Sequence, residues 1–336
     1  MIYPKFIKEN STIGVTAPSN GITDELDIKR LDNAICKLNE KGIKVIETDN
    51  VRKSNLGRSS SSIERVKELE SLFLKKDVEA IICASGGEFM MEILSELDFS
   101  VLTENIKWFQ GYSDPTCLTY VLTTKYDIAT IYSNNIKAFG MDTWHSSLNN
   151  NIEILKGNLI TQNSFEKYEG EKRKQKTGLE EYNLTCDVYW KSLFSDQTFI
   201  KGRMLGGCLD VINELFGTRF DKTKEFIEKY KEDGIIWYFD NFGLNNEILY
   251  RIFWKFKDSG YFNYTKGIVF GRSLIDESYF GISFEDTIKE FFKELNIPII
   301  LDADLGHVSP RMTIINGAIG EIKCKNGKGK ITFYLK

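Results

Sequence analysis

The chain contains the stretch Ile106-Lys107-Trp108-Phe109-Gln110-Gly111-Tyr112-Ser113-Asp114-Pro115-Thr116, followed by the amphipathic run from Cys117 to Leu122. The apolar residues that begin the stretch predict a short buried strand, and the amphipathic run predicts a helix. A serine on the turn between a strand and a helix is the geometry of a nucleophile elbow. Such an elbow lifts the hydroxyl above the sheet edge and points backbone N–H groups at the group under attack. Ser113 is therefore a candidate nucleophile.

The match to an elbow is partial. The usual motif has a second glycine two residues after the serine, and Pro115 occupies that place. The alternative interpretation is that Ser113, Asp114 and Pro115 only cap a helix, with the proline early in its first turn. Local sequence leaves both interpretations open.

The first half of the chain alternates between strand and helix patterns. Ser61 and Glu64 form a capping-box pattern that opens one helix, and Gly42 is placed to end another. Apolar runs predict strands near residues 11–17, 43–47, 78–83, 106–110 and 128–132, with helices near 23–41, 61–76, 117–122 and 148–155. This alternation predicts a parallel α/β sheet covered on both faces.

The alternation stops at residues 166–182, where acidic and basic residues are interleaved and apolar residues are few. This composition predicts a solvated connection. Beyond it we expect strands near 198–205, 235–239, 267–270 and 297–301, helices near 209–215, 245–257 and 284–295, and a final hairpin that turns at Asn326-Gly327. The expected division is residues 1–165, a charged connection 166–185, and residues 186–336.

Composition narrows the class of protein. The 336 residues are 42% hydrophobic and 27% charged, and 44 Lys and Arg against 48 Asp and Glu leave a net charge of -4. The chain thus lacks the excess of positive charge that is typical of proteins that bind nucleic acid or an anionic membrane. No apolar run approaches the roughly 18–20 residues of a membrane span. The first residues lack a signal-peptide pattern, and the six cysteines are scattered without metal spacing. We expect a cytoplasmic protein with reduced cysteines and no metal.

Histidine, the usual base for a serine nucleophile, occurs only at His145 and His307. His307 lies in a loop with Gly306 and Pro310 that follows an apolar strand, which is where α/β proteins place their sites. The sequence around His145 predicts that a helix begins there. The carboxylate that would orient the histidine has three candidates: Asp240 at the end of an apolar strand, and Asp302 and Asp304 on the histidine's own loop.

Ala84-Ser85-Gly86-Gly87-Glu88 follows another apolar strand. Paired glycines at such a place can turn backbone N–H groups toward an anion or oxyanion, although an ordinary tight turn has the same composition. The spacing is that of neither a P-loop nor a dinucleotide fingerprint.

Taken together, these motifs resemble those of the serine LD-carboxypeptidase family, which includes muramoyltetrapeptide carboxypeptidase and the microcin C immunity peptidase. The resemblance rests on Ala17-Pro18-Ser19, Gly86-Gly87, Gly111-Tyr112-Ser113-Asp114-Pro115-Thr116, Leu205-Gly206-Gly207, Leu215-Phe216-Gly217-Thr218, Asp240 and Gly306-His307. It implies an N-terminal parallel-sheet α/β domain, a smaller β-rich C-terminal α/β domain, and an active site in the cleft between them. It also implies a homodimer that needs no cofactor or metal.

The resemblance also assigns roles. Ser113 would be the nucleophile, His307 the general base and acid, and Asp240 the orienting carboxylate. The backbone N–H groups of Gly87 and Asp114 would form the oxyanion hole, with Gly86 and Glu88 close to the substrate. Two positions depart from the family pattern, which usually has Glu at position 240 and, in one branch, Arg at position 85, where this chain has Ser85.

The function implied is hydrolysis of the amide bond before a C-terminal D-amino acid, as in a murein tetrapeptide during cell-wall recycling. A peptidase that detoxifies a peptidyl-nucleotide antibiotic is a second implication. Loss of the usual Glu and Arg leaves open a protein that binds a cell-wall peptide without cutting it. A weaker alternative is an amidotransferase-like enzyme that uses Cys117, which is placed inside the helix rather than on the elbow. Four residues could bind the substrate carboxylate: Arg203, Arg219, Arg272 and Arg311.

Overall fold

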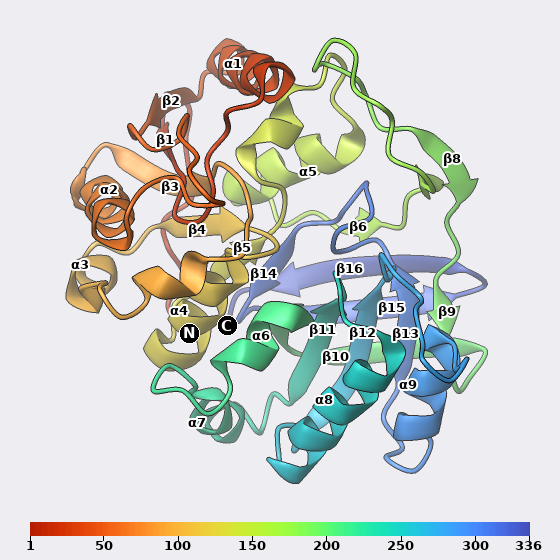
Figure 1. Ribbon diagram of the computed structural model, residues 1–336. Helices are drawn as coiled ribbons and strands as arrows, with labels where there is room; N and C mark the ends of the chain where they lie inside the picture. The colour runs from red at the N-terminus through yellow and green to blue at the C-terminus, as the bar shows by residue number, and fades with distance from the viewer.

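The computed structural model describes residues 1–336 and contains two large sheets lying side by side (Figure 1). The first sheet has the strand order β14-β5-β4-β3-β1-β2. The second has the order β6-β16-β15-β10-β11-β12-β13-β9, and β7 and β8 form a separate ladder. The α/β prediction is confirmed.

The first sheet consists of β1 (Thr12–Thr16), β2 (Lys44–Glu47), β3 (Val78–Cys83), β4 (Trp108–Gly111), β5 (Thr130–Tyr132) and β14 (Ile314–Asn316). The helices of this half are α1 (Glu25–Glu40), α2 (Ser62–Leu74), α3 (Phe99–Glu104), α4 (Thr116–Tyr126) and α5 (Ser146–Leu155), with 3₁₀ turns η1 (Met90–Ile93) and η2 (Ile136–Gly140). Strands β1 to β5 pair in parallel, as the apolar runs predict. The two hydrophobic clusters place α1 and α5 on one face of this sheet and α2 and α3 on the other.

Helix α4 differs from its sequence interpretation. The sequence predicts an amphipathic run from Cys117 to Leu122, but every residue from Thr116 to Thr124 is buried. The helix packs against β5 on one side and against α6, α7 and β10 of the second half on the other. It is therefore a central helix buried on all sides, which has no polar face to show.

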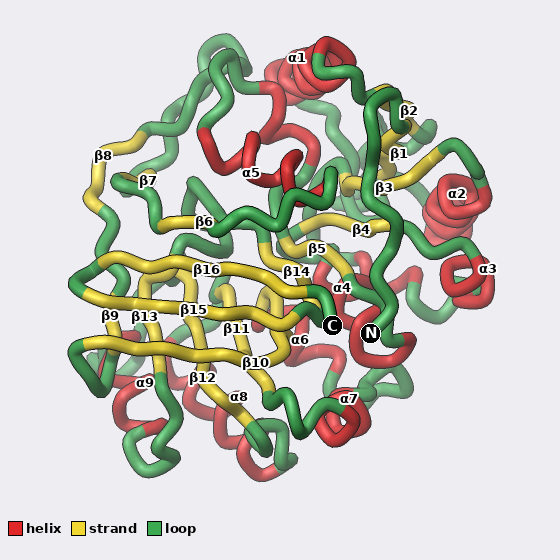
Figure 2. Tube along the Cα trace, turned by 180° about the vertical axis from the view of Figure 1, so that it is seen from behind, coloured by secondary structure: helices red, strands yellow, loops and turns green.

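The second sheet combines a parallel centre with an antiparallel extension. Its strands are β6 (Gln162–Asn163), β9 (Lys191–Ser192), β10 (Gln197–Cys208), β11 (Ile235–Asp240), β12 (Thr265–Gly271), β13 (Ile299–Ala303), β15 (Ile319–Lys325) and β16 (Lys328–Tyr334). Helices α6 (Leu209–Leu215), α8 (Asn246–Asp258) and α9 (Phe284–Phe292) cover one of its faces, and α7 (Thr223–Lys229) lies beside α4 (Figures 1 and 2). Strands β10 to β13 run parallel, whereas β15, β16, β6 and β9 join antiparallel.

Two local sequence patterns form the structures that they predict. Ser61 and Glu64 make the reciprocal bonds of a capping box at the start of α2. Asn326 and Gly327 both have positive φ angles, 51° and 75°, and connect β15 to β16. That is the turn that an Asn-Gly pair favours between antiparallel strands.

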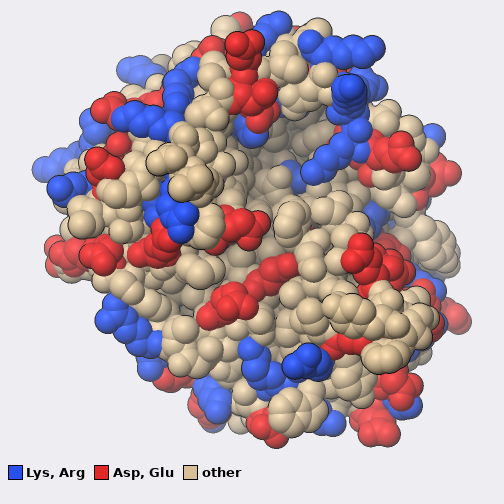
Figure 3. All heavy atoms as spheres, viewed as in Figure 1, with Lys and Arg blue, Asp and Glu red and all other residues tan.

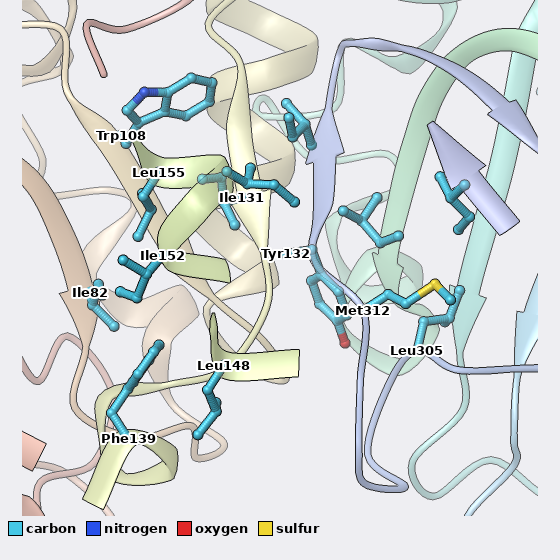
Figure 4. Packing of buried hydrophobic residues seen from close by; sticks show 14 of the residues in the cluster. Ile82, Trp108, Ile131, Tyr132, Phe139, Leu148, Ile152, Leu155, Leu305 and Met312 are labelled. Carbon is cyan, nitrogen blue, oxygen red and sulfur yellow. The ribbon is translucent and has the colours of Figure 1, made fainter. Parts of the chain in front are cut away.

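The two halves of the chain are interwoven. Strand β14 comes from the C-terminal half but pairs antiparallel with β5 of the first sheet, and β6 pairs with β16 of the second. One hydrophobic cluster runs across the junction, from Trp108 and Ile131 through Tyr132 to Met312 and Leu305 (Figure 4). The chain ends lie together (Figure 2), where the Tyr3 hydroxyl donates to the Lys336 carbonyl at 3.1 Å. The two sheets are therefore held in place relative to each other by buried packing at their junction.

The charged segment is exposed where expected, at residues 170–177. Its two flanks are not free, because β7 (Lys167–Glu169) and β8 (Leu184–Asp187) pair with each other. The backbone N–H of Glu169 also donates to the Ser309 carbonyl at 2.8 Å. The segment therefore returns to the loop that carries His307, which charge composition alone does not predict.

None of the helices combines the length and hydropathy that a bilayer-spanning segment needs.

Candidate active site

Ser113 stands on a strained turn between β4 and α4. Its φ angle is +69°, in the left-handed region that residues other than glycine seldom adopt. The turn is tight, because a Cβ atom on Gly111 would lie 2.6 Å from the Cβ of Pro115. Pro115 is the N-cap residue of α4, and no side chain caps the helix. These features match an elbow better than the capping interpretation.

The turn after β3 lies against the Ser113 hydroxyl. A Cβ atom on Gly86 would stand 3.2 Å from Ser113 Oγ, and one on Gly87 would stand 2.3 Å from Ser19 Oγ. Neither the backbone N–H of Gly87 nor that of Asp114 makes a hydrogen bond within the protein. The two residues assigned to the oxyanion hole thus keep free donors beside the serine.

The buried side chain of Asp114 connects the turn of Ser113 to two neighbouring turns. It is 1% exposed and accepts hydrogen bonds from Ser19 Oγ and, at 2.8 Å, from the backbone N–H of Met90. Burial raises the pKa of Asp114, and the bonds from Ser19 and Met90 oppose this shift. Three separate turns of the first half are held together by this one carboxyl group.

Asp240 and His307 are in direct contact. Asp240 ends β11 and is fully buried, and its Oδ2 lies 2.7 Å from His307 Nδ1. Its Oδ1 accepts from the backbone N–H of His307 at 3.1 Å, and Tyr132 Oη donates to Oδ2 at 2.5 Å. Burial alone would raise the pKa of Asp240, but the interactions with His307 and Tyr132 outweigh it and hold the pKa below its ordinary value.

Gly306 permits this approach. Its φ angle is +90°, and a Cβ atom at this position would stand 2.2 Å from Asp240 Oδ1. The short aspartate side chain reaches the histidine directly because the loop comes this close.

The His307 ring lies between two aromatic residues, with ring centroids 5.2 Å from Tyr112 and 4.6 Å from Phe242. Buried Arg311 braces the loop: its Nε donates to the Gly306 carbonyl at 2.6 Å, and its guanidinium carbon lies 4.0 Å from the centre of the Tyr112 ring. Arg311, one of four candidates for binding a substrate carboxylate, is thus engaged in holding the histidine loop.

Ser113 and His307 come from different halves of the chain, and no hydrogen bond joins them in this structure. Tyr112, the neighbour of Ser113, touches the histidine ring. Hydrogen bonds between catalytic groups are often long before substrate binds. The structure thus brings Asp240 and His307 together and places Ser113 on the turn whose Tyr112 contacts the histidine.

Glu88 is exposed at the mouth of this site. Partial burial and the charges of Asp114 and Asp210 raise its pKa, while His307 opposes the shift. Asp210, which sequence reasoning did not single out, accepts from the backbone N–H groups of Phe242 and Gly243 at 3.1 and 2.9 Å.

Other residues that the sequence offered as site candidates are engaged elsewhere in the fold. His145 is the N-cap of α5, Cys117 is buried inside α4, and Asp304 pairs with Arg272. Arg203 is bonded to Asp233 and the Gly317 carbonyl.

One group of side chains has the types that ligate metals. Ligand atoms of Cys208, Asp240 and His307 lie within 4.8 Å of one another. Burial, followed by the nearby charges of Asp240 and Asp210, raises the pKa of the Cys208 thiol well above its ordinary value. Two of the three groups, Asp240 and His307, are already bonded to each other.

Two cavities meet at His307, with volumes of about 720 and 210 Å³. The larger is also lined by Arg272 and Asp302, the smaller by Arg311 and Tyr182, and both by Glu169 and Lys172 of the charged segment. Seen from this side, the molecule is hollowed between the two halves, with basic side chains beside the hollow and acidic side chains below it (Figure 3).

The chain is similar to known proteins over both of its halves. Residues 13–133 match the model of the LD-carboxypeptidase N-terminal domain, and residues 201–322 match that of the C-terminal domain. The chain is 25% identical to a putative carboxypeptidase of Vibrio cholerae, with 98% of each chain covered. It is 24% identical to a probable murein peptide carboxypeptidase of Bacillus subtilis, with 94% of this chain and 89% of the relative covered.

Two solved structures share the fold. Microcin C7 self-immunity protein MccF in complex with aspartyl sulfamoyl adenosine superposes with a TM-score of 0.84 at 22% identity, with both chains fully covered. Muramoyltetrapeptide carboxypeptidase from Oxalobacter formigenes gives 0.76 at 19% identity, covering 97% of this chain and all of that one. Family models over both halves and whole-length relatives lead to one conclusion: this chain belongs to the LD-carboxypeptidase family of peptidases.

Proposed function

We propose that this protein is a serine carboxypeptidase that removes a C-terminal D-amino acid from a murein tetrapeptide. The observation that carries the proposal is the Asp240–His307 contact of 2.7 Å, together with a serine held at a φ of +69° whose neighbour Tyr112 packs against the histidine ring. An acid, a histidine and a serine on such a turn are the parts that acyl transfer needs.

In the proposed reaction, Ser113 Oγ attacks the carbonyl carbon before the terminal residue. His307 Nε2 takes the serine proton and then gives it to the leaving amine. Asp240 stays ionised, holds the ring through Nδ1 and stabilises the charge that the ring gains. The free N–H groups of Gly87 and Asp114 bind the developing oxyanion. Water then attacks the acyl-enzyme by the reverse sequence, which releases the shortened peptide.

The biological setting is part of the proposal. We propose that the protein acts in the cytoplasm, because murein tetrapeptides lose D-alanine there during cell-wall recycling. We also propose a homodimer, which the family resemblance implies. The proposed division is residues 1–165 with the nucleophile, the connection 166–185, and residues 186–336 with the acid and histidine. Gly86 and Glu88 would line the substrate site.

A second candidate function is cleavage of a peptidyl-nucleotide antibiotic. It is favoured by the relative in Escherichia coli, microcin C7 self-immunity protein MccF, which is 23% identical over 88% of this chain. A protein that binds cell-wall peptide without cutting it is the third candidate. The hydrogen bond between Asp240 and His307 argues against that alternative, because it orients the ring for proton transfer.

The deciding experiment measures release of D-alanine from a purified murein tetrapeptide by this protein and by Ser113→Ala. We expect steady release from the protein and a loss of at least about a thousandfold in the variant. Release that persists in Ser113→Ala would place the nucleophile elsewhere. No release from either protein, together with saturable binding, would favour the binding function, and cleavage of a peptidyl-nucleotide alone would favour the second candidate.

A further inference from the structure

Asp240 holds the imidazole of His307 at one ring atom only. Its Oδ2 lies 2.7 Å from Nδ1, and a contact at one atom leaves the ring free to tilt about that atom. The torsion about the Cβ–Cγ bond of histidine is itself broad, without a sharply preferred value. Proton transfer needs Nε2 to point at the serine, so a second contact has to set the plane of the ring.

The Phe242 ring is placed to make this second contact. Its centroid lies 4.6 Å from that of the imidazole, with 39° between the two ring planes. The Tyr112 ring, by contrast, meets the imidazole edge-on, at 5.2 Å and 65°. Phe242 is 40% exposed, so packing in the core does not hold it. The position of its ring therefore depends on the backbone that carries it.

The backbone of Phe242 and Gly243 forms the tip of the connection between β11 and α8. Asn241 closes the base of this connection: its Nδ2 donates to the Leu244 carbonyl at 3.0 Å, and its Oδ1 accepts from the Leu244 N–H at 3.2 Å. The tip makes no hydrogen bond to other backbone groups. It is held by Asp210, whose Oδ2 accepts from the N–H of Phe242 at 3.1 Å and whose Oδ1 accepts from that of Gly243 at 2.9 Å.

The carboxylate of Asp210 suits this task. Successive backbone N–H groups that point at one anion form a small binding concavity, and each carboxylate oxygen accepts one of the two bonds. Hydrogen bonds to an ionised acceptor are also stronger than neutral ones. Asparagine has nearly the same shape but only one acceptor oxygen, and its amide nitrogen would meet an N–H donor. The second acceptor and the charge at position 210 are therefore what hold the tip.

The segment that carries Asp210 is also joined to the turn of the candidate nucleophile. Asp210 lies in the first turn of α6. Two residues before it, the backbone N–H of Cys208 donates to Thr116 Oγ1 at 3.1 Å. The backbone N–H of Thr116 donates in turn to the Ser113 carbonyl at 2.9 Å. This segment therefore contacts both the serine turn and the connection whose ring lies against His307.

We propose that Asp210 is a positioning residue: its carboxylate holds Phe242 against His307, and the Phe242 ring sets the imidazole plane so that Nε2 is aimed at Ser113. The inference rests on the proposed function and adds two residues to its machinery, one of which acts through the other. Because the ring plane matters when the proton moves, loss of either residue lowers kcat and leaves KM close to its wild-type value.

The kinetic test is a double-mutant cycle on D-alanine release from a purified murein tetrapeptide. We expect Asp210→Asn and Phe242→Leu each to lower kcat by about tenfold, with KM within about twofold of the wild type. Since Asp210 acts through the ring, the double variant should also lose about tenfold, whereas two independent effects would multiply to roughly a hundredfold. Phe242→Tyr keeps the ring and should keep activity. Asp98→Asn is the control and should change neither constant, because Asp98 is an exposed helix cap that also accepts from a backbone N–H.

NMR of the histidine ring tests the same contact without any substrate. The chain has only two histidines, and His145→Asn, which leaves a good N-cap residue on α5, identifies the resonances of His307. The ring current of an aromatic residue 4.6 Å away shifts these resonances. We expect Phe242→Leu to move them, and Asp210→Asn to move them in the same direction by a smaller amount.

A loss of roughly a hundredfold in the double variant would overturn the inference. So would full activity in Phe242→Leu, a loss confined to KM in either single variant, or His307 resonances that do not move in Asp210→Asn. If the wild-type protein releases no D-alanine, the proposed function fails. In that case the NMR comparison alone decides whether Asp210 holds the Phe242 ring against His307.

Discussion

Tyr132 donates its hydroxyl proton to the same Asp240 oxygen that contacts His307 Nδ1. The tyrosine ends β5 of the first sheet, whereas the aspartate ends β11 of the second. A single hydrogen bond therefore connects the sheet that carries the candidate nucleophile to the acid–histidine pair. It has direct consequences for activity.

We expect Tyr132→Phe to lower kcat/KM by about tenfold, since a hydrogen bond to a charged group contributes roughly 1.5–3 kcal/mol. The bond from Tyr132 is one of the interactions that lower the pKa of Asp240, so its loss raises that pKa. Activity should then begin to fall at a higher pH on acidification. Tyr238→Phe is the control, because the Tyr238 ring lies 5.6 Å from Tyr132 and its hydroxyl makes no hydrogen bond. An unchanged pH profile in Tyr132→Phe would show that the hydroxyl does not act on Asp240.

Replacing Asp240 with glutamate, the residue that the family pattern leads us to expect there, should lower both stability and activity. Asp240 is fully buried, and the backbone of Gly306 already lies against it. Asp240→Glu adds a methylene where there is no room, at a cost of about 1–3 kcal/mol in stability, and it should lower kcat/KM by more than tenfold. Asp240→Asn keeps the volume but favours the wrong histidine tautomer, with an expected loss of about 10⁴ in kcat. Wild-type kinetics in the Glu variant would mean that the histidine loop can retreat.

Gly306→Ala should abolish most activity and lower the melting temperature, because the new Cβ atom would overlap Asp240 Oδ1. Gly217→Ala separates overlap from backbone strain. Gly217 also has a positive φ, +77°, but an added Cβ would meet nothing within 4 Å. The control should lose about 1 kcal/mol of stability and keep its activity. Equal loss of stability in the two variants would assign the effect to backbone strain alone.

Asp114→Asn should change the pH dependence of stability. Burial raises the pKa of Asp114 in the folded protein above its unfolded value of about 3.9. Its contribution to stability is therefore complete below that value and is lost as pH rises through the folded pKa. Asparagine does not titrate, so the melting temperature of the variant relative to the wild type should increase between about pH 4 and pH 7. A decrease over this interval would mean that Ser19 and Met90 stabilise the carboxylate by more than burial costs.

Local sequence chemistry predicted much of the framework. Apolar runs marked the parallel strands, and the Asn326-Gly327 pair marked the final turn. The rule that sites lie at the carboxyl ends of strands singled out Asp240 and His307. The same rule applied to the strand near residues 128–132 could have found Tyr132.

Other features depend on tertiary contacts that leave no local pattern. Strand β14 is three residues long, which is too short for any periodicity to show. Arginine is usually a surface residue, yet Arg311 is buried and is fixed by hydrogen bonds to the loop around His307. The charged segment was predicted as a solvated connection from its composition, but only the ladder of β7 with β8 and the Glu169–Ser309 contact reveal that it returns to the site.

The pairing of β14 with β5 sets an order of events during synthesis on the ribosome. Residues 1–133 can form five parallel strands, but the free edge of β5 is not covered until Ile314–Asn316 emerge, long after β5 itself. An uncovered strand edge invites pairing with other chains. The nascent protein must therefore keep that edge shielded while all the residues between β5 and β14 are made, and the candidate site cannot form before His307 has left the ribosome.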